Sequence, residues 1–136
     1  MIFRKIIFFY APLFVWMGLI FFLSSIPGFG YSEFNLLVFL ERKGAHIFEY
    51  LVLGFLSSRV FWVYLKDEEN QEFAWGILLS FFWAVFDEIH QLFVFGREGK
   101  ISDVFIDLIG ILLGAGIFLY FAKRRKRIFY KNQIPQ

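Results

Sequence analysis

The chain has 136 residues, of which 59% are hydrophobic and 24% aromatic, and it contains no cysteine. This is more apolar surface than one soluble domain of this length could cover, so the composition predicts an integral membrane protein with a single domain. The lack of cysteine excludes a disulfide framework, a thiolate metal site and a cysteine nucleophile. The distribution of charge is more informative than the net charge of +2, because basic residues are concentrated near the C-terminus.

Four apolar segments are long enough to cross a bilayer core of about 30 Å at about 1.5 Å per residue of helix. We expect spans over residues 6–23, 43–65, 73–95 and 103–122. The first exceeds the apolar region of a cleaved signal peptide, so we expect an uncleaved anchor. Residues 31–40 are apolar but too few to cross, which predicts a short interfacial or re-entrant helix between spans one and two. The expected fold class is all-α, a four-span transmembrane helix bundle in one domain over residues 1–122.

A basic block follows the fourth span and predicts the orientation of the chain. It consists of Lys123, Arg124, Arg125, Lys126 and Arg127, and opens a basic cytoplasmic tail over residues 123–136. Juxtamembrane clusters of this kind contact anionic lipids, so we expect the lipid bilayer and not nucleic acid as the partner. Arg4, Lys5 and Lys66 would lie on the same side of a four-span chain. The positive-inside rule therefore predicts a multi-pass protein with both termini cytoplasmic.

Ionisable residues gather where three of the expected spans meet the opposite side. The densest group is Asp87-Glu88-Ile89-His90-Gln91, at the end of the third span. The topology places this group in the same layer as residues that begin the second and fourth spans: Arg42, Lys43, His46, Glu49, Asp103 and Asp107. Arg42, His46 and Glu49 share one face of the second span, with Lys43 beside His46. Asp87 and Gln91 share a face of the third span, with His90 flanking. Asp103 and Asp107 share a face of the fourth, where Gly110 and Gly114 permit close helix approach beneath them. We expect one polar layer that lines an outward-facing cleft.

Charged side chains cost about 2.5 to 3.5 kcal/mol each near mid-bilayer, and clusters of them usually mark functional sites. The ligand-binding candidates are Arg42, Lys43, His46, Glu49, Asp87, His90, Gln91, Arg97, Asp103 and Asp107. The catalytic candidates are His46, Glu49, Asp87, Glu88 and His90. Imidazoles and carboxylates also suit a divalent metal, with His46, Asp87 and His90 as candidate ligands, although no tight motif such as H-E-x-x-H is present. The sequence does not identify a cofactor.

The energetic cost of burying several charged side chains in this layer must be offset. Ion pairs are one form, and the candidate pairs join Arg42 or Lys43 to Glu49, and Arg97 to Asp87 or Asp103. A hydrated cleft and a bound cation are the other two forms. The sequence leaves all three open.

Several blocks of residues resemble the VanZ-like family of small bacterial membrane proteins. They are Ser24-Ser25-Ile26-Pro27, Lys43-Gly44-Ala45-His46 with Glu49-Tyr50, Asp87-Glu88-Ile89-His90-Gln91, Gly96-Arg97, and Ser102-Asp103 through Asp107 to Gly110. The family often has proline before the Gly-Arg pair, where this chain has Phe95. The family takes its name from a member associated with low-level resistance to the antibiotic teicoplanin. The resemblance therefore implies a role at the cell envelope and a location in the bacterial cytoplasmic (inner) membrane.

Three functions are compatible with such a cleft. In the first, the cleft binds a lipid headgroup, a glycan carrier or an amphiphilic antibiotic, in a role similar to teicoplanin resistance, and Arg42, Lys43 and Arg97 take an anionic group. In the second, a membrane-embedded enzyme acts on a lipid-linked substrate, with His46 or His90 as general base or metal ligand. In the third, the polar layer only fixes the register of helices that assemble with a partner.

Overall fold

The computed structural model describes residues 2–28, 36–64 and 71–131. Within these ranges the chain forms four helices and no strand: α1 (Ile2–Ser24), α2 (Leu36–Tyr64), α3 (Gln71–Gln91) and α4 (Ile101–Lys131). The prediction of an all-α protein is confirmed. The interfacial helix expected over residues 31–40 falls partly outside the described residues, and the described part, from Leu36 onward, belongs to α2.

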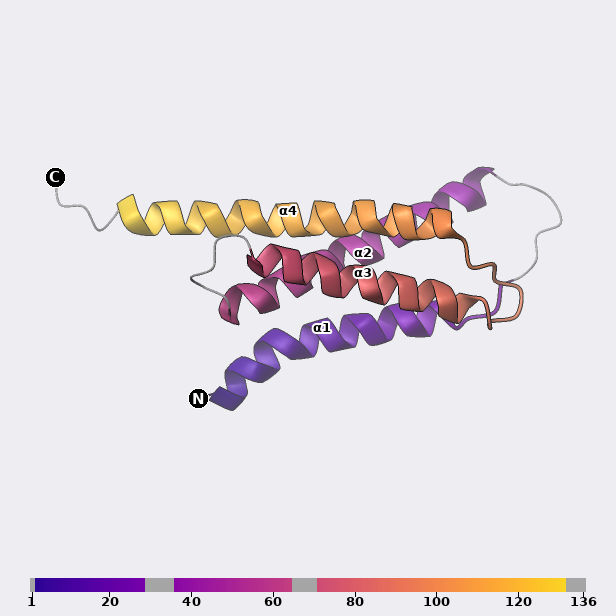
Figure 1. Cartoon of the computed structure of the whole chain (residues 1–136), viewed down its shortest axis with the longest axis horizontal. Helices are drawn as coiled ribbons and strands as arrows, with labels where there is room; N and C mark the ends of the chain where they lie inside the picture. The colour runs from indigo at the N-terminus through magenta and orange to yellow at the C-terminus, as the bar shows by residue number, and fades with distance from the viewer. Residues whose placement is uncertain (1, 29–35, 65–70, 132–136) are drawn as a thin grey trace.

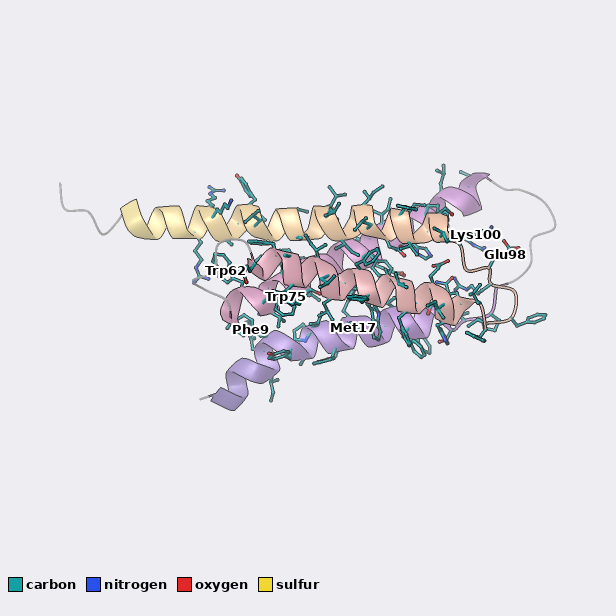
Figure 2. The ribbon with its side chains drawn as sticks, in the orientation of Figure 1. Phe9, Met17, Trp62, Trp75, Glu98 and Lys100 are labelled. Carbon is teal, nitrogen blue, oxygen red and sulfur yellow. The ribbon has the colours of Figure 1, made fainter. Side chains whose placement is uncertain are left out.

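The four helices alternate in direction, so both termini lie at one end of the bundle (Figure 1). We call this the terminus end, and we call the opposite end the far end. The loop between α3 and α4 lies at the far end, where Glu98 and Lys100 are seen (Figure 2). α2 is the central helix, because it packs against each of the other three. α1 packs against α2 and α3, and diverges from α4 toward its own N-terminus (Figure 1).

Three helices are long and apolar enough to cross a membrane, within the part of the chain that the structure describes. Their apolar windows are Ile7–Ser24, Phe73–Gln91 and Ile101–Arg125. α2 is not among these three, because its 29 residues include charged side chains such as Glu49 and Arg59. Its length is sufficient, since a helix of this size extends about 44 Å. A central helix can carry such groups because they face neighbouring helices and not lipid.

The C-terminal ends of α3 and α4 differ from those of the predicted spans. α3 ends at Gln91, and residues 92–95 form turns in which Leu92 N–H bonds the Ile89 carbonyl at 3.2 Å. α4 continues to Lys131, so the basic block over residues 123–127 is part of a helix. Apolar periodicity could not show this extension, because the basic residues interrupt it while having good helix propensity.

The closest contact between helices joins α2 to α4 through glycines on both sides. A Cβ atom at Gly114 would overlap the Leu51 carbonyl oxygen, and one at Gly110 would lie 2.5 Å from the Ile47 carbonyl oxygen. From the other side, Gly54 faces the backbone of Ile111. The spacing of Gly110 and Gly114 predicted a close approach of two helices, and the structure has this approach. Small residues let membrane helices approach at backbone distance.

The interior is mainly apolar apart from the polar layer's residues and the buried serines Ser57, Ser58 and Ser80, and the outer surface is apolar as well. The buried apolar residues come from all four helices: Leu13, Met17 and Ile20, Tyr50, Leu53 and Val60, Phe73 and Ala84, and Ile111, Ala115 and Ala122. Large side chains such as Phe14, Phe82 and Phe105 are more than 60% exposed. An apolar exterior of this kind fits helices that are surrounded by lipid.

Replacing Gly114 by alanine tests the close approach of α2 and α4. The new Cβ would overlap the Leu51 carbonyl oxygen, so the helices must separate, and we expect the free energy of unfolding to fall by about 1–3 kcal/mol. Gly116→Ala is the matched control, because no atom lies within 4 Å of its Cβ position. Unfolding in detergent micelles, followed by circular dichroism, measures both variants. Equal stability of the two would contradict the close contact.

Candidate functional site

Polar side chains of α2, α3 and α4 are buried together at the far end of the bundle. We call the following set the polar layer: Lys43, His46, Glu49, Tyr50, Asp87, Glu88, Gln91, Asp103 and Asp107. Asp107 and Tyr50 have no exposed surface, and Asp87 exposes only 2%. Ionisable groups this deeply buried in an apolar bundle need partners, so their contacts determine what the layer can do.

Two pairs of side chains join α2 to α4 across the glycine contact. Lys43 Nζ forms an ion pair with Asp103 Oδ1, and His46 Nδ1 lies 2.9 Å from Asp107 Oδ1. Lys43 and His46 are about one helical turn apart on α2, and Asp103 and Asp107 are about one turn apart on α4. With Asp107 as acceptor, the Nδ1 atom of His46 carries the hydrogen. Lys43 thus has a partner on α4 that the sequence did not suggest.

On α3, adjacent carboxylates make different contacts. Gln91 Nε2 donates a hydrogen bond to Asp87 Oδ2 at 3.1 Å, within the same helix. The Glu88 Oε1 atom accepts a hydrogen bond from the backbone N–H of Lys100. Glu88 therefore fixes the far-end loop to α3, whereas Asp87 remains directed to the interior of the bundle.

Four buried atoms of the polar layer have no hydrogen-bond partner among the described residues. They are the Tyr50 hydroxyl, Asp87 Oδ1, Glu88 Oε2 and Asp107 Oδ2. The Tyr50 hydroxyl lies within electrostatic range of several carboxylates, including those of Asp87 and Asp107. Buried polar atoms are almost always satisfied in native proteins, by protein, water or ligand. The interior of the layer is therefore rich in hydrogen-bond acceptors that can bind an added group.

Arg97 makes contacts that differ from the predicted ones. Its Nε atom donates to the Ile26 carbonyl at 3.0 Å and its Nη2 atom donates to the Leu23 carbonyl at 2.9 Å. The Gly28 N–H adds a bond of 3.0 Å to the Phe95 carbonyl. Leu23 is in the last turn of α1 and Ile26 follows the end of that helix, so Arg97 caps the C-terminal end of α1 and docks the far-end loop against it.

The same loop contains a position that requires glycine. Gly96 has a φ of +71°, and a Cβ there would overlap the Gly28 carbonyl oxygen. Beyond it, Lys100 Nζ lies 2.6 Å from Glu98 Oε2 in an exposed ion pair. The hydrogen bond and the charge of Lys100 lower the pKa of the Glu98 carboxyl. This pair is on the surface and takes no part in the polar layer.

His90 and His46 contact different helices. Its Nε2 atom lies 3.0 Å from Ser25 Oγ, and its ring stacks on Phe21 with centroids 4.3 Å apart. Because the Ser25 hydroxyl donates to the Phe21 carbonyl at 2.6 Å, His90 Nε2 is the donor to Ser25. His90 thus faces α1, while His46 faces α4. The candidate metal ligands His46, Asp87 and His90 do not converge, and no group of three such ligands is found in the described residues.

The remaining candidates lie at the edge of the layer. Arg42 is exposed and Glu49 is half-buried, in electrostatic range of His46 and Arg97. The backbone carbonyl of Glu49 also accepts a hydrogen bond from Trp16 Nε1 at 2.8 Å. Sequence analysis did not include Tyr50 among the site residues. Its position one turn after His46, on the same face of α2, is the signal that could have identified it.

Comparison with known proteins identifies relatives of the chain. The family model described as VanZ/LLP1 matches residues 9–123. The chain is also 37% identical over 94 residues to an uncharacterized membrane protein, YwnJ, of Bacillus subtilis (strain 168). That alignment covers 69% of this chain and 59% of the relative, so the chain spans less than two thirds of the relative's length. No solved structure matches the chain significantly. With three helices able to span a bilayer, the chain is a membrane protein.

A double-mutant cycle tests the arrangement of the two histidines. His46→Ala and Asp107→Ala remove two contacting side chains, so we expect a coupling of about 0.5–3 kcal/mol in the free energy of unfolding. His90→Ala with Asp107→Ala is the control pair, because His90 contacts α1, and these effects should add within about 0.5 kcal/mol. Unfolding in micelles measures both cycles. Strong coupling between His90 and Asp107 would show that the histidines share one site.

Proposed function

Because the chain belongs to the VanZ/LLP1 family, we propose that it is a bacterial envelope protein whose polar layer binds the headgroup of an amphiphile. The observation that carries this proposal is the set of buried acceptors without partners: the Tyr50 hydroxyl oxygen and one oxygen each of Asp87, Glu88 and Asp107. Such a set has a high desolvation cost unless a donor-rich group fills it. The association of one member of the family with teicoplanin resistance supports an amphiphilic ligand at the envelope.

The proposal includes four transmembrane spans and a defined orientation. α2 crosses the bilayer with the other three helices, each of which packs against it. The exposed residues Lys123, Arg124 and Arg125 favour a cytoplasmic terminus end, where they contact anionic lipids of the inner membrane. The polar layer then lies in the outer half of the membrane and opens toward the outer face.

The charges of the layer indicate which headgroup fits. The layer contains more carboxylates than basic groups, Lys43 already pairs with Asp103, and Arg97 is bonded to carbonyls of α1. Apart from the Tyr50 hydroxyl, which can also donate, an anionic group would therefore meet acceptors and not donors. Hydroxyl, amide and ammonium groups would donate to those acceptors, and sugars and amino sugars carry them densely. A lipid-linked glycan or a glycan carrier is the ligand class that fits best, and an amphiphilic antibiotic with similar groups is the alternative ligand.

One observation favours a second function, catalysis on a lipid-linked substrate. Asp107 holds His46 at 2.9 Å through Nδ1, and a carboxylate in this position orients an imidazole as a general base. His46 Nε2 would then accept the proton of an attacking hydroxyl or water. Product formation from a lipid-linked glycan by the purified protein, and its loss in His46→Gln, would establish this function instead of binding alone.

Tyr50→Phe separates a binding layer from a structural one. The change removes only a hydroxyl that has no partner in the described residues, so the free energy of unfolding should stay equal or rise. Binding of a polyprenyl-linked sugar, titrated into purified protein by calorimetry, should weaken about tenfold because one hydrogen bond to the ligand is lost. Ser58→Ala is the control, since it removes another buried hydroxyl without a partner, farther along α2. Reduced stability with unchanged binding in Tyr50→Phe would overturn the proposal.

The lack of native cysteine makes the orientation directly measurable. Lys100→Cys and Lys123→Cys place single thiols in the far-end loop and in the basic block, both exposed. In intact cells, a membrane-impermeant maleimide should label Lys100→Cys and not Lys123→Cys, and permeabilised cells should label both. Labelling with the opposite pattern would place the polar layer on the cytoplasmic side.

A further inference from the structure

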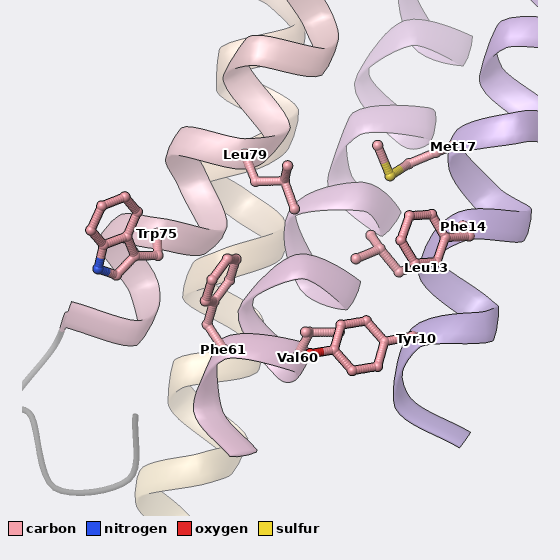
Figure 3. Close-up of a pocket in the computed structure, with 8 residues that line it drawn as sticks. All are labelled: Tyr10, Leu13, Phe14, Met17, Val60, Phe61, Trp75 and Leu79. Atoms are coloured by element: carbon pink, nitrogen blue, oxygen red, sulfur yellow. The ribbon is translucent and has the colours of Figure 1, made fainter. Parts of the chain in front are cut away.

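A cavity of about 580 Å³ lies between α1, α2 and α3, in the half of the bundle toward the terminus end (Figure 3). Its walls are apolar and include Leu13, Phe14 and Met17 of α1, Val60 of α2, and Trp75 and Leu79 of α3. None of these residues belongs to the polar layer. The cavity is therefore separate from the site discussed above, and its volume is in the range of small-molecule binding pockets, roughly 300–1,000 Å³.

The depth of the cavity limits what can enter it. Its α1 and α3 walls lie in the apolar windows Ile7–Ser24 and Phe73–Gln91, which fit the hydrocarbon region of a bilayer. Of the lining residues, Phe14 of α1 is 63% exposed and Trp75 of α3 is 50% exposed, so the cavity wall reaches the outer surface of the bundle at both helices. Apolar surface at that depth contacts acyl chains and not water.

A cation lies next to the cavity, over Phe8 and Phe9 of α1. Arg59 directly precedes the lining residue Val60, and its guanidinium lies over the rings of Phe8 and Phe9 at 4.5 and 4.7 Å. It also donates a hydrogen bond of 3.4 Å to the Phe8 carbonyl. A guanidinium has several N–H donors in a planar fork that suits phosphate, and the aromatic rings hold it in place.

We propose that this cavity binds one acyl chain of an anionic phospholipid from the leaflet at the terminus end, with the lipid phosphate at Arg59. The apolar walls accommodate the chain and Arg59 selects the headgroup charge. The basic residues Lys123, Arg124 and Arg125 at the same end of α4 would raise the local concentration of such lipids. This lipid site does not depend on ligand binding at the polar layer, and each can fail without the other.

Quenching of Trp75 fluorescence by brominated lipid tests the proposal. The full chain with Trp75 as its sole tryptophan is reconstituted in mixtures of brominated phosphatidylglycerol and unlabelled phosphatidylcholine, and in the reverse mixtures. The quenching curves give the relative association constant of the two lipids at Trp75. We expect phosphatidylglycerol to be favoured about fivefold, since one basic group near the surface contributes that much. Equal quenching at every mole ratio would overturn the proposal.

Arg59→Gln in the same background should remove most of this preference, because the cation next to the cavity is lost. Arg125→Gln is the matched control, since it removes an exposed basic residue of α4 that does not line the cavity, and it should keep the preference. A preference that survives Arg59→Gln and disappears in Arg125→Gln would assign the effect to the basic block.

Leu79→Phe tests whether the acyl chain enters the cavity. The larger side chain takes up cavity volume, so maximal quenching of Trp75 should fall while circular dichroism stays unchanged. Unchanged quenching in a folded Leu79→Phe variant would mean that lipid contacts Trp75 only from outside, and would refute the cavity site.

Discussion

The close packing of α2 against α4 is the contact on which the rest of the structure depends. Gly54, Gly110 and Gly114 bring the two backbones together, and without that approach the polar ends of the helices would be too far apart to pair. The glycine contact lies directly below the two pairs Lys43–Asp103 and His46–Asp107. Van der Waals contact between backbones thus positions the charged side chains of the two helices for pairing.

Burial determines the chemistry of the polar layer. The pairs between α2 and α4 satisfy some of its charges, but they leave buried acceptors on Tyr50, Asp87 and Asp107. A layer built only to hold helices together would be more stable with apolar residues, since unsatisfied buried polar groups are destabilising. A ligand that supplies the missing donors would remove this cost, and the unpartnered oxygens therefore support the proposed headgroup site.

Sequence patterns predicted the class of protein and the location of its polar residues, but not the contacts between them. The apolar lengths and the Gly110–Gly114 spacing were sufficient for an all-helical bundle, because both depend on local geometry. The partners of Arg97 and His90 could not be predicted in the same way. Arg97 caps α1 and His90 bonds Ser25, and both contacts depend on where a loop docks against a helix far away in sequence.

We propose that the polar layer binds a donor-rich headgroup between α2, α3 and α4. An experimental density map of the protein, crystallised in a lipid mesophase with added polyprenyl-linked glycan, tests this claim most directly. We predict density for sugar hydroxyls within hydrogen-bond distance of the Tyr50 hydroxyl and the free oxygens of Asp87 and Asp107. A map in which Tyr50 bonds directly to one of those carboxylates, with the glycan bound elsewhere, would contradict it.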